Sequence, residues 1–301
     1  RQMCIRDREK MIEKYYDGAI EQVAAGLGTV EKNYLLVRYS GQFSVENLND
    51  TKQLEKNEDI FVQVHEFETG EITCAYEPYL TMICDGFRRY MTGTFEEFME
   101  TCDVYYLHRP VLLGYFNQDN TGREEIILLD EVAYEQERML AALERMLCAI
   151  ADRHPVLFVL NRFQLASKST IQLTARFLKC ENCNIGLVLG VSDIQAMPEF
   201  LVPDWEMLYE TLDDGSKIYH IGNSGRKKEE TIDDEKYVDY GSEKVYRKLQ
   251  NMVEFLDFDQ AAYYLETIER KIKFDNLLVD DAARFRMWLL FVKVSILRQD
   301  I

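Results

Sequence analysis

The sequence contains no apolar run of about 18 or more residues, the length that a membrane-spanning helix needs. It also lacks an amino-terminal charged region followed by an apolar core and a small-residue cleavage site, so nothing indicates secretion. Hydrophobic residues make up 47% of the chain, which is enough for a globular core. We therefore predict a soluble, cytoplasmic protein, and its 301 residues are long enough for two domains.

Cysteine and histidine are few, and they lack the spacing of a metal site or a disulfide scaffold. The seven cysteines include one close pair, Cys180 and Cys183, and the four histidines show no ligand spacing around it. A zinc site would need a second such pair or nearby histidines. We expect no bound metal, and we expect reduced thiols in a reducing compartment.

Basic residues are outnumbered, because 35 Lys and Arg against 53 Asp and Glu give a net charge of −18. Such a chain repels a phosphate backbone, and no basic stripe with interleaved aromatic residues offsets this, so direct nucleic-acid binding is not expected. Residues 1–8, RQMCIRDR, resemble translated adaptor sequence and are interpreted as a non-native leader. The chain stops inside an apolar helical pattern, so the natural protein is expected to continue past Ile301.

Short apolar runs alternate with helical patterns over residues 9–222. The predicted strands are 34–41, 60–66, 156–160, 185–192 and 217–221. Helical patterns are present in 9–27, in 78–117 with a break at 92–94, and in 123–153, 168–179 and 203–212. Several of the strands are continuously apolar, which is typical of strands buried on both faces. This order predicts an α/β domain with a mostly parallel sheet and flanking helices.

The first helix is predicted to bury one apolar face. The residues that recur at helical spacing on that face are Met11, Ile12, Tyr15, Ala19, Val23 and Ala24. A break that contains glycine follows the helix, and the first predicted strand comes next.

The character of the chain changes after the last predicted strand. Residues 223–242 are rich in Gly, Ser and alternating charge without core periodicity, which predicts a linker. Residues 243–301 are helical throughout, with predicted helices at 245–256, 259–272 and 280–297, and with Asp259 and Asp280 as helix-start residues. Helices of this length with small residues at their crossings are typical of an all-α helical-repeat segment.

A phosphate-binding loop is missing where a nucleotide-binding fold would have one. Such a loop needs two glycines, a lysine and a Ser or Thr in the pattern G-x-x-x-x-G-K-[ST]. After the first strand the chain offers YSGQFSVENLND, which contains Gly41 but no second glycine and no lysine. Glu46 would oppose a triphosphate.

The acidic residues of a nucleotide-hydrolysing site are missing as well. At the end of the third strand one acid would hold magnesium and a second would orient the attacking water. The chain has Asn161 and Arg162 at these positions. Asn161 is uncharged and Arg162 has the opposite charge, so hydrolysis is not expected.

The order of these elements over about residues 8–222 resembles the ATPase region of AAA/STAND signal-transduction ATPases. The most similar piece is 154–178, in which the residues that keep the family pattern are Gln164, Ala166, Ser169 and Thr170. The resemblance implies a P-loop NTPase-like fold, tetratricopeptide-like helices after it, and a C-terminal output domain in the full-length chain. It places degenerate nucleotide-site positions at Gly41, Ser44, Asn47, Asn161 and Arg162.

We therefore predict a non-catalytic regulatory or interaction module of a cytoplasmic signal-transduction protein, with a protein partner at its helical repeats and no membrane or nucleic-acid partner. No catalytic residue and no cofactor are predicted, although ATP or ADP could bind without being hydrolysed. The alternative is an unconventional nucleotide-binding ATPase or sensor of the STAND class, in which Arg38 or Arg162 contacts phosphates. A third interpretation is a helical-repeat scaffold whose α/β part is only a folding platform. Side chains that fill the strand ends would favour it.

Overall fold

The five predicted strands form one sheet in the computed structural model. It describes residues 5–28, 33–40, 43–45, 48, 59–68, 70–118, 132–180, 184–192, 198–212, 218–221, 239–274, 277 and 279–298. The strands are β1 (Tyr34–Tyr39), β2 (Phe61–Glu66), β3 (Val156–Asn161), β4 (Ile185–Ser192) and β5 (Ile218–Ile221). Their order is β2-β3-β4-β1-β5, and each neighbouring pair is parallel. The predicted α/β fold with a parallel sheet is confirmed.

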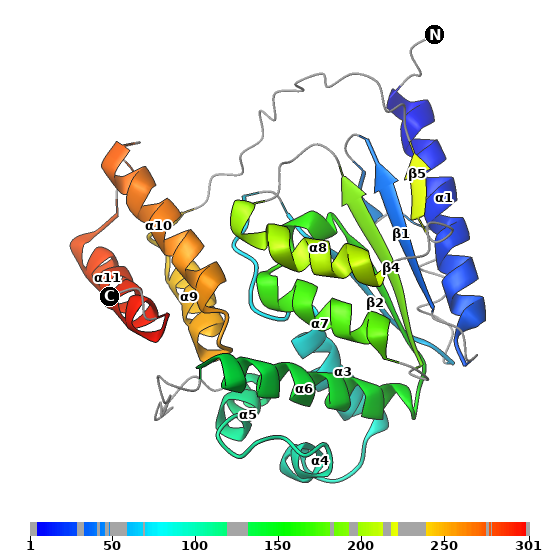
Figure 1. The fold of residues 1–301 in the computed structure, drawn as a ribbon, viewed down its shortest axis with the longest axis horizontal. Coiled ribbons are helices and arrows are strands. Elements are labelled where there is room, and N and C mark those ends of the chain that lie inside the picture. The colour runs from blue at the N-terminus through cyan, green and yellow to red at the C-terminus, as the bar shows by residue number, and fades with distance from the viewer. Residues whose placement is uncertain are drawn as a thin grey trace.

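Helices cover both faces of this sheet (Figure 1). On one face α1 (Ile5–Gly26) packs against alternate residues of β1, among them Leu35 and Val37. On the other face Leu36 belongs to a larger core that extends into the remaining helices. These helices are α3 (Tyr79–Tyr90), α4 (Phe95–Thr101), α5 (Arg109–Asn117), α6 (Val132–Ala151), α7 (Lys168–Lys179) and α8 (Val202–Thr211). Short 3-10 turns, η3 (Phe163–Leu165) and η4 (Glu199–Leu201), precede α7 and α8. None of the described helices is long and apolar enough to cross a membrane.

The buried face of α1 differs from the predicted one by a residue. Tyr16 is fully buried, whereas Tyr15, which the sequence pattern assigned to that face, is 45% exposed. The helical pattern is compatible with either tyrosine, because neighbouring positions are about 100° apart around the helix axis. Packing against the sheet buries Tyr16 and leaves Tyr15 at the surface. Tyr16 is therefore available to contact residues of the candidate site.

One helix boundary differs from the sequence pattern, and another lies outside the described residues. The predicted helical region 78–117 is interrupted at 92–94 as expected, and again between α4 and α5, where a turn leads to Arg109. Pro110 follows at the start of α5, a position where its missing N–H costs nothing. The helix predicted from residue 123 is described from Val132, and its earlier part lies outside the described residues.

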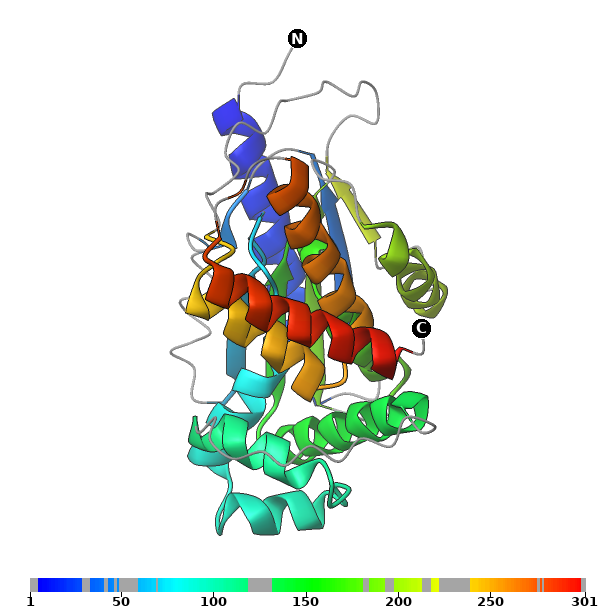
Figure 2. The same ribbon diagram turned by 90° about the vertical axis from the view of Figure 1, so that its left-hand side faces the viewer.

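The three predicted C-terminal helices are present. They are α9 (Glu243–Glu254), α10 (Phe258–Phe274) and α11 (Asp281–Leu297), and Asp280 caps α11 by accepting from the N–H of Ala283 at 2.8 Å. They pack beside α6 and α7 and share the larger core of the α/β part (Figures 1 and 2). For example, the Phe255 ring meets Tyr76 edge to face with centroids 6.3 Å apart. The predicted linker is described only from residue 239 onward.

The strand order creates a switch point beside β1. From β1 the chain crosses to the edge strand β2, and from β4 it crosses over β1 to reach β5. Because β1 and β4 are neighbours, the chain leaves their carboxyl ends in opposite directions. In open α/β sheets, ligands bind in the crevice outside such strand ends. The carboxyl ends of β1, β4 and the adjacent β3 are therefore where this fold would accept a ligand.

Candidate functional site

Three of the five predicted site residues are described, and the structure brings them together. Asn161 donates from Nδ2 to the carbonyl oxygen of Phe43 at 3.0 Å, immediately before Ser44. Ser44 and Arg162 are joined through the carboxylate of Glu66. Gly41 and Asn47 lie outside the described residues. The three described positions therefore form one connected cluster at the carboxyl edge of the sheet.

Asn161, at the end of β3, is held by two tyrosine hydroxyls. Tyr16 donates to its Oδ1 at 2.7 Å from α1, and Tyr39 donates to the same atom at 2.8 Å from the end of β1. Asn161 is completely buried. Because its carbonyl oxygen already accepts two hydrogen bonds, the atom that would otherwise contact a cation is occupied by the protein itself.

Aromatic packing surrounds this amide. Tyr16 stacks on Phe43 with ring centroids 5.1 Å apart, and Tyr39 meets Phe43 edge to face at 6.0 Å. Burial raises the pKa of Tyr16 and of Tyr39 well above the usual tyrosine value, so both hydroxyls stay protonated. They can therefore donate to Asn161 throughout the physiological pH range.

The approach of Tyr16 to the sheet depends on a glycine of β4. A Cβ atom built at Gly190 would lie 1.4 Å from the Tyr16 hydroxyl oxygen and 2.6 Å from Oδ1 of Asn161. No other residue type fits this position while the two hydrogen-bonded side chains stay in place. Gly190 is thus part of the site, although it supplies no chemical group.

Glu66, at the end of β2, occupies the hydrogen-bond donors of the segment after β1. Its Oε2 accepts from the Ser44 hydroxyl at 2.7 Å and from the Val45 N–H at 3.1 Å. Its Oε1 lies 3.0 Å from Nη2 of Arg162, with Glu66 and Arg162 side chains 15% and 24% exposed. A hydroxyl, a backbone N–H and a guanidinium are the donors that proteins use to hold a phosphate group. Here a carboxylate of the same chain takes all three.

The backbone of Arg162 is strained at this point. Its φ of 51° and ψ of 42° lie in the left-handed region, which costs a non-glycine residue about 1 kcal/mol or more. The conformation begins the η3 turn and directs the guanidinium toward Glu66. The ion pair with Glu66 gives the Arg162 side chain a structural role at the end of β3.

Three polar residues of the segment 154–178 make contacts within the chain. Gln164 accepts from the N–H of Ser192 at 3.1 Å and so joins the η3 turn to the end of β4. Thr170 donates to the carbonyl oxygen of Glu77 at 3.0 Å. Ser169 donates through its N–H and its hydroxyl to Asp257, which belongs to the C-terminal helical part. Each of these polar groups is therefore paired within the chain.

Sequence reasoning missed Glu66, Tyr16, Tyr39 and Gly190. Glu66 was the last residue of a predicted strand, and in a parallel sheet with β2 beside β3 it falls opposite Asn161. The strand order that sets this pairing is not readable from one sequence. The guanidinium carbon of Arg38 lies 4.7 Å from the centroid of the Tyr209 ring. Within the described part of the chain, Arg38 makes no hydrogen bond or ion pair with Glu66 or Asn161.

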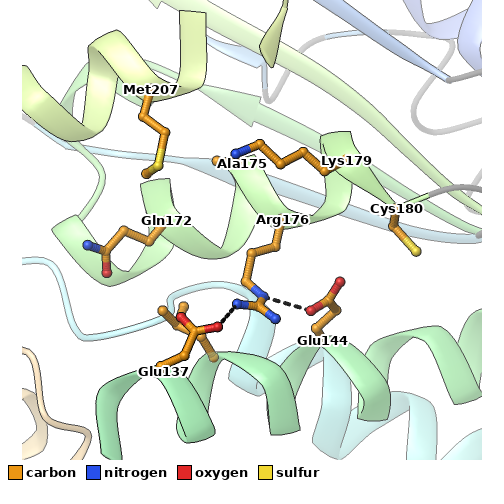
Figure 3. Close-up of a pocket in the computed structure, with 9 residues that line it drawn as sticks. Glu137, Glu144, Gln172, Ala175, Arg176, Lys179, Cys180 and Met207 are labelled. Atoms are coloured by element: carbon orange, nitrogen blue, oxygen red, sulfur yellow. Dashed lines mark hydrogen bonds and ion pairs between the residues drawn. The ribbon is translucent and has the colours of Figure 1, made fainter. Parts of the chain in front are cut away.

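A separate cavity of about 520 Å³ lies between α6, α7 and α8, away from the strand ends (Figure 3). Arg176 reaches across it and donates from Nε to Glu144 at 2.7 Å, and its guanidinium also pairs with Glu137. The residues that line it are Glu137, Leu140, Glu144, Gln172, Ala175, Arg176, Lys179, Cys180 and Met207. None of the predicted site residues is among them.

Metal-binding groups do not gather in the described part of the chain. No cluster of three or more His, Cys, Asp or Glu side chains with ligand geometry is found there. Cys183, the close neighbour of Cys180 in the sequence, lies outside the described residues.

Comparison with known proteins assigns the chain to no family. No family model matches the sequence, and a search of curated proteins found no relative. The functional inference therefore depends on the contacts of Glu66, Asn161 and the helices around them.

Proposed function

We propose that this chain is a non-catalytic regulatory or interaction module of a cytoplasmic signal-transduction protein, built on a STAND-like P-loop scaffold. The observation that carries the proposal is the position of the Glu66 carboxylate. It accepts from Ser44 and Val45 and pairs with Arg162, where a nucleotide phosphate would otherwise be held. A nucleotide would have to displace this carboxylate and overcome its negative charge.

The contacts of Asn161 support the same proposal. Hydrolysis would require a carboxylate at the end of β3 that holds magnesium, and a second acid that orients water. Asn161 instead has its carbonyl oxygen occupied by Tyr16 and Tyr39, and Arg162 is engaged by Glu66. Two requirements for turnover are thus replaced by internal structural contacts.

The docking of the C-terminal helices is consistent with a module that works by contacts. Asp257, Asp259 and Gln260 at the start of α10 bind the first turn of α7. This turn follows β3, so the helical part is attached directly beside the candidate site. Side chains fill the carboxyl ends of the strands, which would also suit a helical-repeat scaffold whose α/β part is only a folding platform. That interpretation predicts no partner for the helical part.

Calorimetric titration of the chain with ATP and ADP, with and without magnesium, tests the proposal. We expect no heat above dilution and no shift of the melting temperature by either nucleotide. A micromolar dissociation constant, about 8 kcal/mol of binding free energy, would overturn it and make the chain a nucleotide sensor. Measurable phosphate release that stops in an Arg162→Ala variant would establish the ATPase alternative.

A further inference from the structure

Helix α11 has two apolar faces. The inner face packs on α9 and α10 through five buried residues, Ala283, Met287, Leu290, Val294 and Leu297. On the opposite face Phe285, Trp288, Leu289 and Ile296 are 58%, 57%, 48% and 43% exposed. These four are close to half of the nine large hydrophobic side chains exposed in the described part of the chain, so they form a patch instead of a random scatter.

The four outer residues lie along one stripe. Their spacing of three, four and seven residues along the helix returns to the same side at each turn. The rings of Phe285 and Trp288 stack on each other with centroids 6.2 Å apart and planes 22° apart. Figure 2 shows α11 as the outermost helix of the C-terminal part, with the others behind it. We call these four residues the α11 stripe.

The charges beside the α11 stripe are mainly basic. Arg284, Arg286 and Lys293 lie on the same helix, in a chain whose net charge is −18. Arg286 pairs with Glu243 at 2.8 Å, whereas Arg284 is exposed and makes no ion pair with any described residue. The acids near the stripe are Asp281, in the first turn of α11, and Glu243, which pairs with Arg286. The central part of the stripe is therefore an apolar surface with a basic border.

This border favours one kind of occupant. A second copy of the chain placed stripe to stripe would bring the basic borders together, which is unfavourable for like charges in contact. A helix with an apolar face and acidic flanks would complement both the stripe and its border. Tryptophan and arginine are also the residue types that most often dominate binding energy at protein interfaces.

We propose that the α11 stripe binds an acidic amphipathic helix of a protein partner. The inference deepens the proposed interaction function and depends on it. Phe285, Trp288 and Leu289 enter the apolar face of the bound helix, in the way that helix-in-groove complexes use residues spaced by one turn. Arg284 pairs with an acidic side chain on the flank of that helix.

Two synthetic helical peptides of about 20 residues provide the test. They share one leucine face, and their flanks are glutamate in one and lysine in the other. The chain has two tryptophans, and Trp205 is 2% exposed, so a blue shift of the fluorescence reports burial of Trp288. We expect the glutamate peptide to bind with a dissociation constant of about 10 μM and the lysine peptide at least tenfold more weakly.

Variants of the chain locate the binding surface, with fluorescence anisotropy of a labelled peptide as the readout. Trp288→Ala should raise the dissociation constant of the glutamate peptide at least tenfold. Tyr106→Ala removes an equally exposed aromatic ring far along the sequence, at the turn between α4 and α5, and should leave binding unchanged. Arg284→Glu should reverse the preference toward the lysine peptide. A loss of folding cannot produce such a reversal.

Several results would overturn the proposal. They are equal affinity for the two peptides, no binding of either peptide at about 1 mM, and binding that survives Trp288→Ala. Self-association that disappears in Trp288→Ala, measured by light scattering, would assign the stripe to a second copy instead. Binding of the chain to anionic lipid vesicles without peptide binding would assign it to a lipid surface. The nucleotide titration is independent of these outcomes. A failure of the α11 stripe to bind the peptide can therefore be distinguished from a failure of the proposed function.

Discussion

The carboxylate of Asp257 caps the amino terminus of α7 by accepting from the Ser169 N–H at 3.1 Å and from the Ser169 hydroxyl at 2.5 Å. Oε1 of Gln260 accepts from the preceding N–H of the same turn, that of Lys168, at 3.1 Å. A helix amino terminus offers such N–H groups to anions, including phosphates. In this chain the start of α10 uses them, and the C-terminal helices are thereby joined to the α/β part.

The Asp257 contact predicts a pH dependence. Burial raises the pKa of Asp257 to about 6, against about 3.9 for an aspartate in an unfolded chain. The Asp257 carboxyl group therefore binds a proton more tightly in the folded state than in the unfolded state. Protonation of Asp257 contributes its full stabilisation of the fold below about pH 4, and this stabilisation is lost as the pH rises through 6. We expect the unfolding free energy of the wild type, relative to Asp257→Asn, to fall by roughly 2 to 3 kcal/mol from about pH 4 to about pH 7.

Urea unfolding of both proteins across this pH range measures the difference. Asp152→Asn, which changes an exposed aspartate just after α6, should give a curve parallel to the wild type. If the Asp257→Asn curve were also parallel, the buried carboxylate would not be titrating in the folded state.

Gly190→Ala should destabilise the fold because its Cβ meets the Tyr16 hydroxyl and the Asn161 amide. We expect a loss of roughly 2 to 4 kcal/mol of unfolding free energy. Gly18→Ala is the matched control, since a Cβ there meets nothing within 4 Å and the position is helical. That variant should gain roughly 0.5 to 1 kcal/mol. If Gly190→Ala left the unfolding free energy unchanged, Tyr16 would not approach β4 as closely as described.

Removal of the Glu66 carboxylate should make the Val45 N–H and the Arg162 guanidinium accessible to an anion. We expect pyrophosphate to raise the melting temperature of Glu66→Ala and to leave the wild type unchanged, because only the variant has an open site. Glu206→Ala, at an exposed position of α8, should behave as the wild type. Equal responses of all three proteins would show that Glu66 does not occupy an anion-binding arrangement.

Asn161→Asp places an acid at the end of β3, yet we expect the variant to be destabilised and without ATPase activity. The carboxylate cannot donate to the Phe43 carbonyl oxygen as the amide does, and it places a charge in a fully buried position. We expect a loss of roughly 2 to 4 kcal/mol at neutral pH. Burial raises the pKa of such an acid, so the loss should shrink as the pH falls toward 5.

Denaturant unfolding and phosphate-release assays with Mg-ATP check this variant. Asn251→Asp is the control, because Oδ1 of Asn251 accepts from the Ala75 N–H at 3.1 Å and an aspartate can do the same. ATP turnover by Asn161→Asp would contradict the view that the surrounding tyrosines and Glu66 also close the site.

Much of the fold could be predicted because apolar spacing is a local property. The five strands, the cap at Asp280 and the three C-terminal helices follow from hydrophobic periods and turn residues that lie within a few positions of one another. Positions of the candidate site could be placed only where a motif was expected and absent. That is why Asn161, Arg162 and Ser44 were found and Glu66 was not.

The sequence alone determined which elements form, because each strand and helix buries a face that its own residues define. It also determined that the acids and the lysine of a nucleotide-hydrolysing site are absent. Only the tertiary structure decided which groups meet at the carboxyl edge of the sheet. Glu66 reaches Arg162 and Tyr16 reaches Asn161 because β2 lies beside β3 and Gly190 lets α1 approach β4. Such contacts join residues far apart in the chain, and they arise from how the elements pack together.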